Sequence, residues 1–113
     1  MEELFEIAES SENGIPVLSI RGEIDVSTAP ELRDRLLSVA QSGNTTAVVD
    51  LREVTFLDST ALGVLVSALK RFRSVEGDLR LVVTGRSIVK VLEITGLVDV
   101  FMIFDTLEKA VQE

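Results

Sequence analysis

The sequence predicts a single α/β domain over residues 1–113, with a mainly parallel central sheet, an N-terminal antiparallel hairpin and about four helices. Three observations predict this class. Apolar runs of strand length alternate with amphipathic segments of helical period from residue 28 onward. An Asn-Gly pair, which is typical of tight hairpin turns, separates the first two strand-like runs. A chain of 113 residues with 46% hydrophobic content is long enough for one packed core.

The N-terminal part of the chain predicts the hairpin. Leu4, Ile7 and their neighbours give a short, weak strand pattern, and Asn13-Gly14 follows as the turn. The second strand is expected over Pro16–Ile20, where proline suits a strand start or edge.

The first helix is expected after this hairpin. Thr28 and Glu31 have the spacing of a capping box, and Pro30 is tolerated in a first helical turn. One face of this helix carries an apolar stripe, and Gly43 offers a stop. The stripe comprises Leu32, Leu36, Val39 and Ala40.

The central part of the chain predicts a buried strand followed by a second helix. Ala47–Leu51 is the compact apolar run of a buried parallel strand, and a loop through Val54, Phe56 and Leu57 is expected to lead to Asp58. The helix begins at Ser59 and ends before Gly77. Its buried stripe comprises Leu62, Leu65, Val66, Leu69 and Phe72.

The remaining elements continue the alternation. A strand is expected over Leu79–Thr84, a helix over Ser87–Thr95 with Gly96 as its stop, and a strand over Val100–Phe104. Asp105 and Glu108 have the spacing that caps a short C-terminal helix. All five phenylalanines are expected in or near the core. Phe101 and Phe104 are three residues apart and cannot both face inward on a regular strand. One of them is therefore expected to line an exposed apolar patch.

The composition disfavours several classes of function. Without cysteine or histidine, the usual zinc ligands and a Ser-His or Cys-His mechanism are missing from this chain, so we expect no zinc site and no enzyme. A net charge of −8 opposes binding to nucleic acid or to an anionic membrane. The acidic N-terminus does not resemble a signal peptide, so the expected location is cytoplasmic, and the expected state is a monomer.

The start of the second helix is the candidate functional segment. Asp58 suits the N-cap position, where its carboxylate would accept from the N–H of Thr60 or Ala61, and the Ser59 hydroxyl would then face solvent. In a mainly parallel sheet, the loop that contains Asp25 should share an edge with Asp58 and Ser59. From spacing alone, these residues could equally be ordinary capping residues and a solvated loop carboxylate.

A family resemblance adds to this interpretation. Val49-Asp-Leu, then Phe56-Leu-Asp-Ser-Thr-Ala-Leu-Gly63, preceded by Gly22-Glu-Ile-Asp25 and Thr28-Ala29, resembles the STAS-domain anti-sigma factor antagonists of bacteria. Thr95-Gly-Leu97 followed by Phe101 is similar to the C-terminal segment of that family. Many members carry glycine where this chain has Ala61.

The resemblance implies a STAS-like fold and a function in partner switching. Members bind an anti-sigma factor, which is also a serine kinase that uses ATP and magnesium, and thereby release the sigma factor. The kinase would phosphorylate Ser59 and end the binding, and a phosphatase would restore it. Because ATP belongs to the partner, the resemblance implies no cofactor for this chain. The residues implied at the contact are Glu23, Asp25, Thr28, Asp58, Ser59, Thr60 and Leu62.

Two alternatives stay open. The chain could be a STAS scaffold or accessory subunit of a stress-signalling or lipid-transport assembly, without a phosphorylation switch. Separately, Lys70, Arg71 and Arg73 fall mostly off the buried stripe of their helix. They could mark a polyanion site or simply a solvated helix face.

Overall fold

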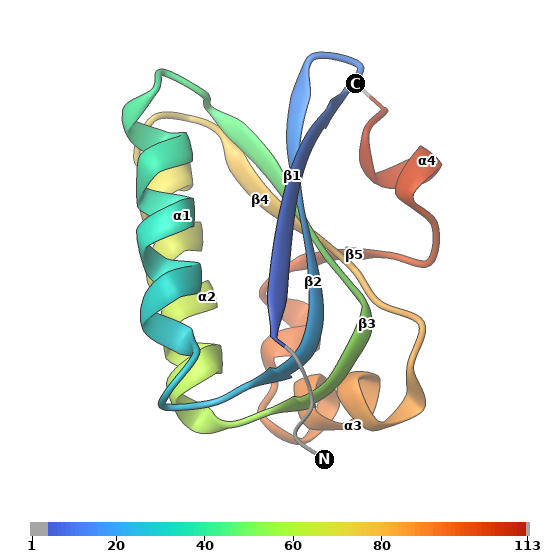
Figure 1. The fold of residues 1–113 in the computed structure, drawn as a ribbon. Coiled ribbons are helices and arrows are strands. Elements are labelled where there is room, and N and C mark those ends of the chain that lie inside the picture. The colour runs from blue at the N-terminus through green and yellow to red at the C-terminus, as the bar shows by residue number, and fades with distance from the viewer. Residues whose placement is uncertain (1–4, 113) are drawn as a thin grey trace.

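The computed structural model describes residues 5–112 and contains a five-stranded sheet whose strands lie in chain order (Figure 1). The hairpin strands β1 (Glu6–Glu12) and β2 (Ile15–Ile24) pair antiparallel, whereas β2, β3 (Thr46–Leu57), β4 (Asp78–Val82) and β5 (Met102–Phe104) pair in parallel. The predicted fold class is therefore confirmed. Leu4, at the start of the expected first strand, lies outside the described residues.

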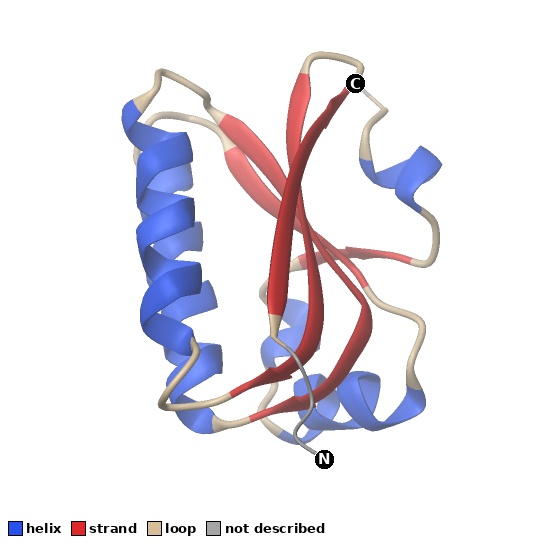
Figure 2. Ribbon diagram, in the orientation of Figure 1, coloured by secondary structure: helices blue, strands red, loops and turns tan. Residues whose placement is uncertain are grey.

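The helices α1 (Ala29–Gln41), α2 (Ser59–Arg73) and α3 (Arg86–Ile94) each connect two parallel strands. Figure 2 shows α1 and α2 side by side along one face of the sheet. The short 3₁₀ helix Leu97–Asp99 precedes β5, and α4 (Leu107–Ala110) lies on the other side of the sheet. No helix within residues 5–112 is long and apolar enough to cross a membrane.

Two apolar clusters hold these layers together. The main core joins the sheet to α1, α2 and α3, because crossovers that advance in one direction keep their helices on one face. Its buried members include Leu18, Ile24, Leu32, Leu36, Val49, Leu65, Leu69, Phe72, Leu81, Ile88 and Leu92. The smaller cluster under α4 comprises Ile15, Val17, Val48, Val82, Ala110 and Val111. The stripe expected on α2 is buried as predicted, apart from Val66, which is half-buried.

The prediction of a loop after Leu51 is wrong, because β3 continues to Leu57. Its second half pairs with β2 only, and four of the six side chains in residues 52–57 are exposed, so this half lacks the continuous apolar run of a fully buried strand. Val54 and Leu57 are buried, whereas Phe56 is 48% exposed, which corrects its expected place in the core.

The C-terminal expectations also need correction. The last strand begins at Met102 rather than Val100. Phe101 is buried in the main core and Phe104 packs against the smaller cluster, so the two rings lie on opposite faces and neither is exposed. The exposed apolar side chains of this segment are Val100 and Met102.

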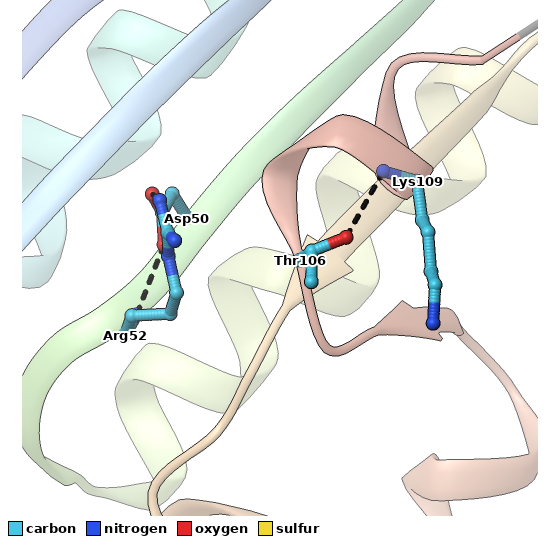
Figure 3. Close-up of polar contacts among 4 residues, drawn as sticks. All are labelled: Asp50, Arg52, Thr106 and Lys109. Atoms are coloured by element: carbon cyan, nitrogen blue, oxygen red, sulfur yellow. Dashed lines mark hydrogen bonds and ion pairs between the residues drawn. The ribbon is translucent and has the colours of Figure 1, made fainter.

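Figure 3 shows two pairs of residues joined by hydrogen bonds, one pair at the start of α4 and one pair on β3. Thr106, not Asp105, caps α4, because its hydroxyl accepts from the Lys109 amide at 3.1 Å. Asp50 is only 7% exposed, yet its carboxylate accepts from the Arg52 guanidinium at 2.9 and 2.7 Å and from the Arg52 amide at 3.1 Å. The buried carboxylate is therefore fully partnered, which makes its burial tolerable.

Candidate functional site

The candidate site lies where β3 passes into α2. Asp58 has an extended backbone and caps the helix, since its Oδ1 accepts from the Ala61 amide at 2.9 Å. This confirms the predicted N-cap. Ser59 is the first helical residue and is exposed, and within residues 5–112 its hydroxyl has no protein hydrogen-bond partner. The hydroxyl is therefore accessible to a modifying enzyme.

The loop that contains Asp25 lies beside this helix start. Ile24 and Leu57 are register partners at the ends of β2 and β3, and the Asp58 amide donates to the Ile24 carbonyl at 3.2 Å. The expectation that the two loops share one sheet edge is confirmed. Gly22 contributes to this geometry, because its φ of 100° lies where β2 changes register against β3.

Residues 25–28, the Asp25 loop, are held by their own hydrogen bonds. The Asp25 carboxylate accepts from the Ser27 hydroxyl at 2.7 Å and from the amides of Ser27 and Thr28 at 2.9 and 3.2 Å. The Thr28 hydroxyl accepts from the Asp25 amide at 2.9 Å and lies 3.0 Å from the Glu23 carbonyl, to which it donates. The loop is thus ordered before any partner arrives.

These bonds correct the capping box expected at Thr28 and Glu31. Thr28 occupies the N-cap position of α1 but makes no side-chain cap, because its hydroxyl is directed back into the Asp25 loop. The Asp25 carboxylate accepts instead from the Thr28 amide, and the Asp25 carbonyl accepts from the amides of Thr28 and Ala29. Glu31 lies near Arg35 on the same helix, with 4.0 Å between carboxylate and guanidinium.

The remaining residues of the site divide into exposed and buried groups. Thr60 and Glu23 are exposed. Leu62 is only 9% exposed and belongs to the main core, so it offers little surface to a partner. Two apolar side chains at this edge were not among the predicted site residues, namely Val26, 70% exposed in the Asp25 loop, and Phe56 on β3. The sequence held one signal for an exposed apolar contact, because Val26 lies between Asp25 and Ser27 in an otherwise polar loop.

The edge therefore combines an exposed serine, three carboxylates and two apolar side chains. The carboxylates belong to Glu23, Asp25 and Asp58. Within the described part of the chain, no group of three or more acidic side chains is arranged to hold a metal ion. A surface of this kind is suited to contact with another protein, and modification of the serine would change its charge.

We expect the Asp25 carboxyl to titrate below its ordinary value of 3.8. Hydrogen bonds from the Ser27 hydroxyl and then the Ser27 amide favour the ionised form and lower the pKa of Asp25, against a smaller opposing effect of burial. Because the pKa is lowered, these bonds stabilise the folded chain fully at pH values above 3.8. This contribution is lost as the pH falls through the lowered pKa of Asp25.

An NMR titration of side-chain carboxyl carbons measures this pKa. The Ser27 and Thr28 amide shifts should follow the same midpoint, and Asp25→Asn should remove the transition from both. A midpoint at or above 3.8 would contradict the hydrogen-bond network.

The chain is similar in sequence to a known domain family and to a regulatory protein of that kind. Residues 7–110 match the model of the STAS domain family. The anti-sigma-B factor antagonist of Bacillus subtilis (strain 168) is 38% identical over 102 residues, which cover 90% of this chain and 92% of that protein.

Two solved structures share the fold. An anti-sigma factor antagonist from Mycobacterium paratuberculosis superposes with a TM-score of 0.87 at 29% identity, covering 95% of this chain and 91% of that one. The Bacillus cell fate determinant SpoIIAA in its phosphorylated form superposes with a TM-score of 0.72 at 22% identity, covering 96% of both chains.

Proposed function

Because the chain belongs to the STAS domain family, we propose that it is an anti-sigma factor antagonist whose binding is switched off by phosphorylation of Ser59. In this role it is a cytoplasmic regulator and not an enzyme. It binds an anti-sigma factor that is also a serine kinase, and so frees the sigma factor. The kinase supplies ATP and magnesium, and a phosphatase resets Ser59. The names of the relatives support the anti-sigma partner.

The observation that carries the switch is the exposed Ser59 hydroxyl at the first position of α2, beside the Asp25 loop. A phosphate there adds about −1.5 to −2 charges at neutral pH. Helix N-termini attract anions, but Asp58 already accepts from the Ala61 amide, so the phosphate gains less from this helix start. On docking, the phosphate must be desolvated beside existing carboxylates, which opposes the complex.

The same geometry favours a switch that leaves the fold intact. Ser59 is exposed and packs into neither apolar cluster, so a phosphate can extend into solvent. The fold is compatible with such a modification, since SpoIIAA shares it in phosphorylated form. The contact residues that we propose are Glu23, Asp25, Thr28, Asp58, Ser59 and Thr60, with Val26 and Phe56 as apolar contacts.

The test is to incubate the chain with its anti-sigma factor, ATP and magnesium, and to follow intact mass and phosphopeptides. We expect one phosphate, located on Ser59, and none on Ser59→Ala. Thr60→Ala removes the neighbouring hydroxyl and should still receive one phosphate, on Ser59. Phosphate on Thr60 would assign the switch to the neighbouring hydroxyl. Stable binding without phosphorylation would favour the scaffold alternative.

A further inference from the structure

The helix layer carries a groove on its outer side, between α1 and α2. Its volume is about 550 Å³, and side chains of both helices line it. Leu36 and Phe72 are buried at its base, whereas Leu37, 38% exposed, and the half-buried Val64 and Ala68 present apolar surface to solvent. We call this surface the helix groove. Besides these five residues, it is lined by Arg33, Ser67, Lys70, Arg71 and Ser74.

The charged residues of the helix groove are all basic. Arg33 comes from α1, and Lys70 and Arg71 come from the last turn of α2. Within residues 5–112, neither Lys70 nor Arg71 forms an ion pair, while Arg33 lies 4.0 Å from the exposed Asp34 carboxylate of its own helix. Three cations without an acidic lining residue form a local positive surface on a chain whose net charge is −8.

The helix groove also continues the surface of the candidate site. Ser59, Gly63 and Ser67 are exposed and four residues apart, so they lie along one side of α2, and Ser67 lines the groove. From Val64 to Ser74 the groove follows α2 for about 15 Å, which is close to three helical turns. A partner that covers Ser59 can therefore extend directly into the groove.

We propose that the helix groove binds an acidic, amphipathic helical segment of the anti-sigma factor, as a second contact beyond Ser59. The exposed apolar side chains receive the apolar face of that helix, and Arg33, Lys70 and Arg71 pair with its carboxylates. The inference rests on the proposed function. It gives α2 two contacts of opposite charge, which fix the direction in which the partner lies along the helix.

The experiment measures affinity for the anti-sigma factor, without ATP, in two variants with equal change in charge. Lys70→Glu/Arg71→Glu should weaken binding about tenfold or more at low salt, and the loss should shrink as salt rises. Arg21→Glu/Lys109→Glu, on β2 and α4, is the control and should bind as the unaltered chain does. Thermal melting checks each fold, and Lys70→Ala/Arg71→Ala provides a milder variant that should show a smaller loss in the same direction.

A photo-crosslinking residue at position 68 identifies the occupant. The crosslink should fall on an acidic helical segment of the anti-sigma factor, and a crosslink to a basic or uncharged segment would overturn the assignment. Binding that is unaffected in Lys70→Glu/Arg71→Glu would also overturn it and leave the proposed function intact. If the unaltered, unphosphorylated chain fails to bind the anti-sigma factor, the proposed function itself is wrong.

Discussion

Ser59→Asp is expected to weaken binding of the anti-sigma factor more than about a hundredfold, whereas Ser59→Ala should retain the affinity of the unaltered chain. The aspartate places a permanent charge at the start of α2, where the Asp58 carboxylate and the Asp25 loop are already negative. A loss of about 3 kcal/mol is enough for this change in affinity, and burying one unpaired charge at an interface reaches that size. Titration calorimetry measures both affinities.

A second measurement separates blocked docking from unfolding. Far-UV circular dichroism and melting temperature should be the same for Ser59→Asp and Ser59→Ala, because the residue lies on the surface. Ser87→Asp, at an exposed position in the first turn of α3, is the matched control and should leave the affinity unchanged. Equal affinities for the alanine and aspartate variants at position 59 would contradict the switch.

Gly77→Ala is expected to destabilise the fold by about 3 kcal/mol or more and to lower the melting temperature by roughly 10–20 °C. A Cβ at this position would lie 1.5 Å from the Thr45 carbonyl oxygen and 2.4 Å from its carbon. Both atoms are backbone, and the same carbonyl accepts from the Asp78 amide at 3.1 Å where β4 begins beside β3. Relief therefore requires moving apart the two chain segments that lead into β3 and β4.

Gly63→Ala is the control for this substitution. Gly63 lies inside α2, and a Cβ there meets no atom within 4 Å. Alanine should stabilise the helix by about 0.5–1 kcal/mol, since glycine costs that much in a helix interior. Chemical denaturation measures both variants, and a Gly77→Ala protein as stable as the unaltered chain would show that the approach of residue 77 to Thr45 is not as close as described.

The sequence predicted best where one physical signal dominated. Alternating apolar runs and helical stripes located the parallel sheet, and Asp58 before the stripe of α2 identified the cap and the exposed serine. Prediction failed where partners distant in sequence decide the structure. The second half of β3 pairs with β2 alone, four of its six side chains (residues 52–57) are exposed, and the segment has no continuous apolar run.

The capping errors have a related cause. Thr28 has the right spacing to Glu31, but its hydroxyl finds better partners in the Asp25 amide and the Glu23 carbonyl. At α4, Thr106 stands one position after the acidic residue expected to cap, and its own hydroxyl takes the role. Local spacing cannot choose between neighbouring oxygens, because the choice depends on how the preceding loop turns.

The candidate site was predicted in its polar residues and missed in its apolar ones. Glu23, Asp25 and Ser59 are brought to one edge by the register of β2 and β3, which a parallel sheet makes predictable. Phe56 was expected in or near the core with the other phenylalanines, but it is 48% exposed on β3. The roles of these residues in binding stay predictions.

The hydrogen bonds inside residues 25–28 have a consequence for how fast and how selectively a regulator can act. Freezing a flexible backbone costs about 1–2 kcal/mol per residue, and here folding has already met that entropy cost. The loop therefore already has a fixed conformation when another protein binds, so ordering of the loop lowers neither the association rate nor the affinity. In the proposed switch, the complex can then stay weak enough for one phosphate to reverse it, while the preformed loop still discriminates among competing proteins.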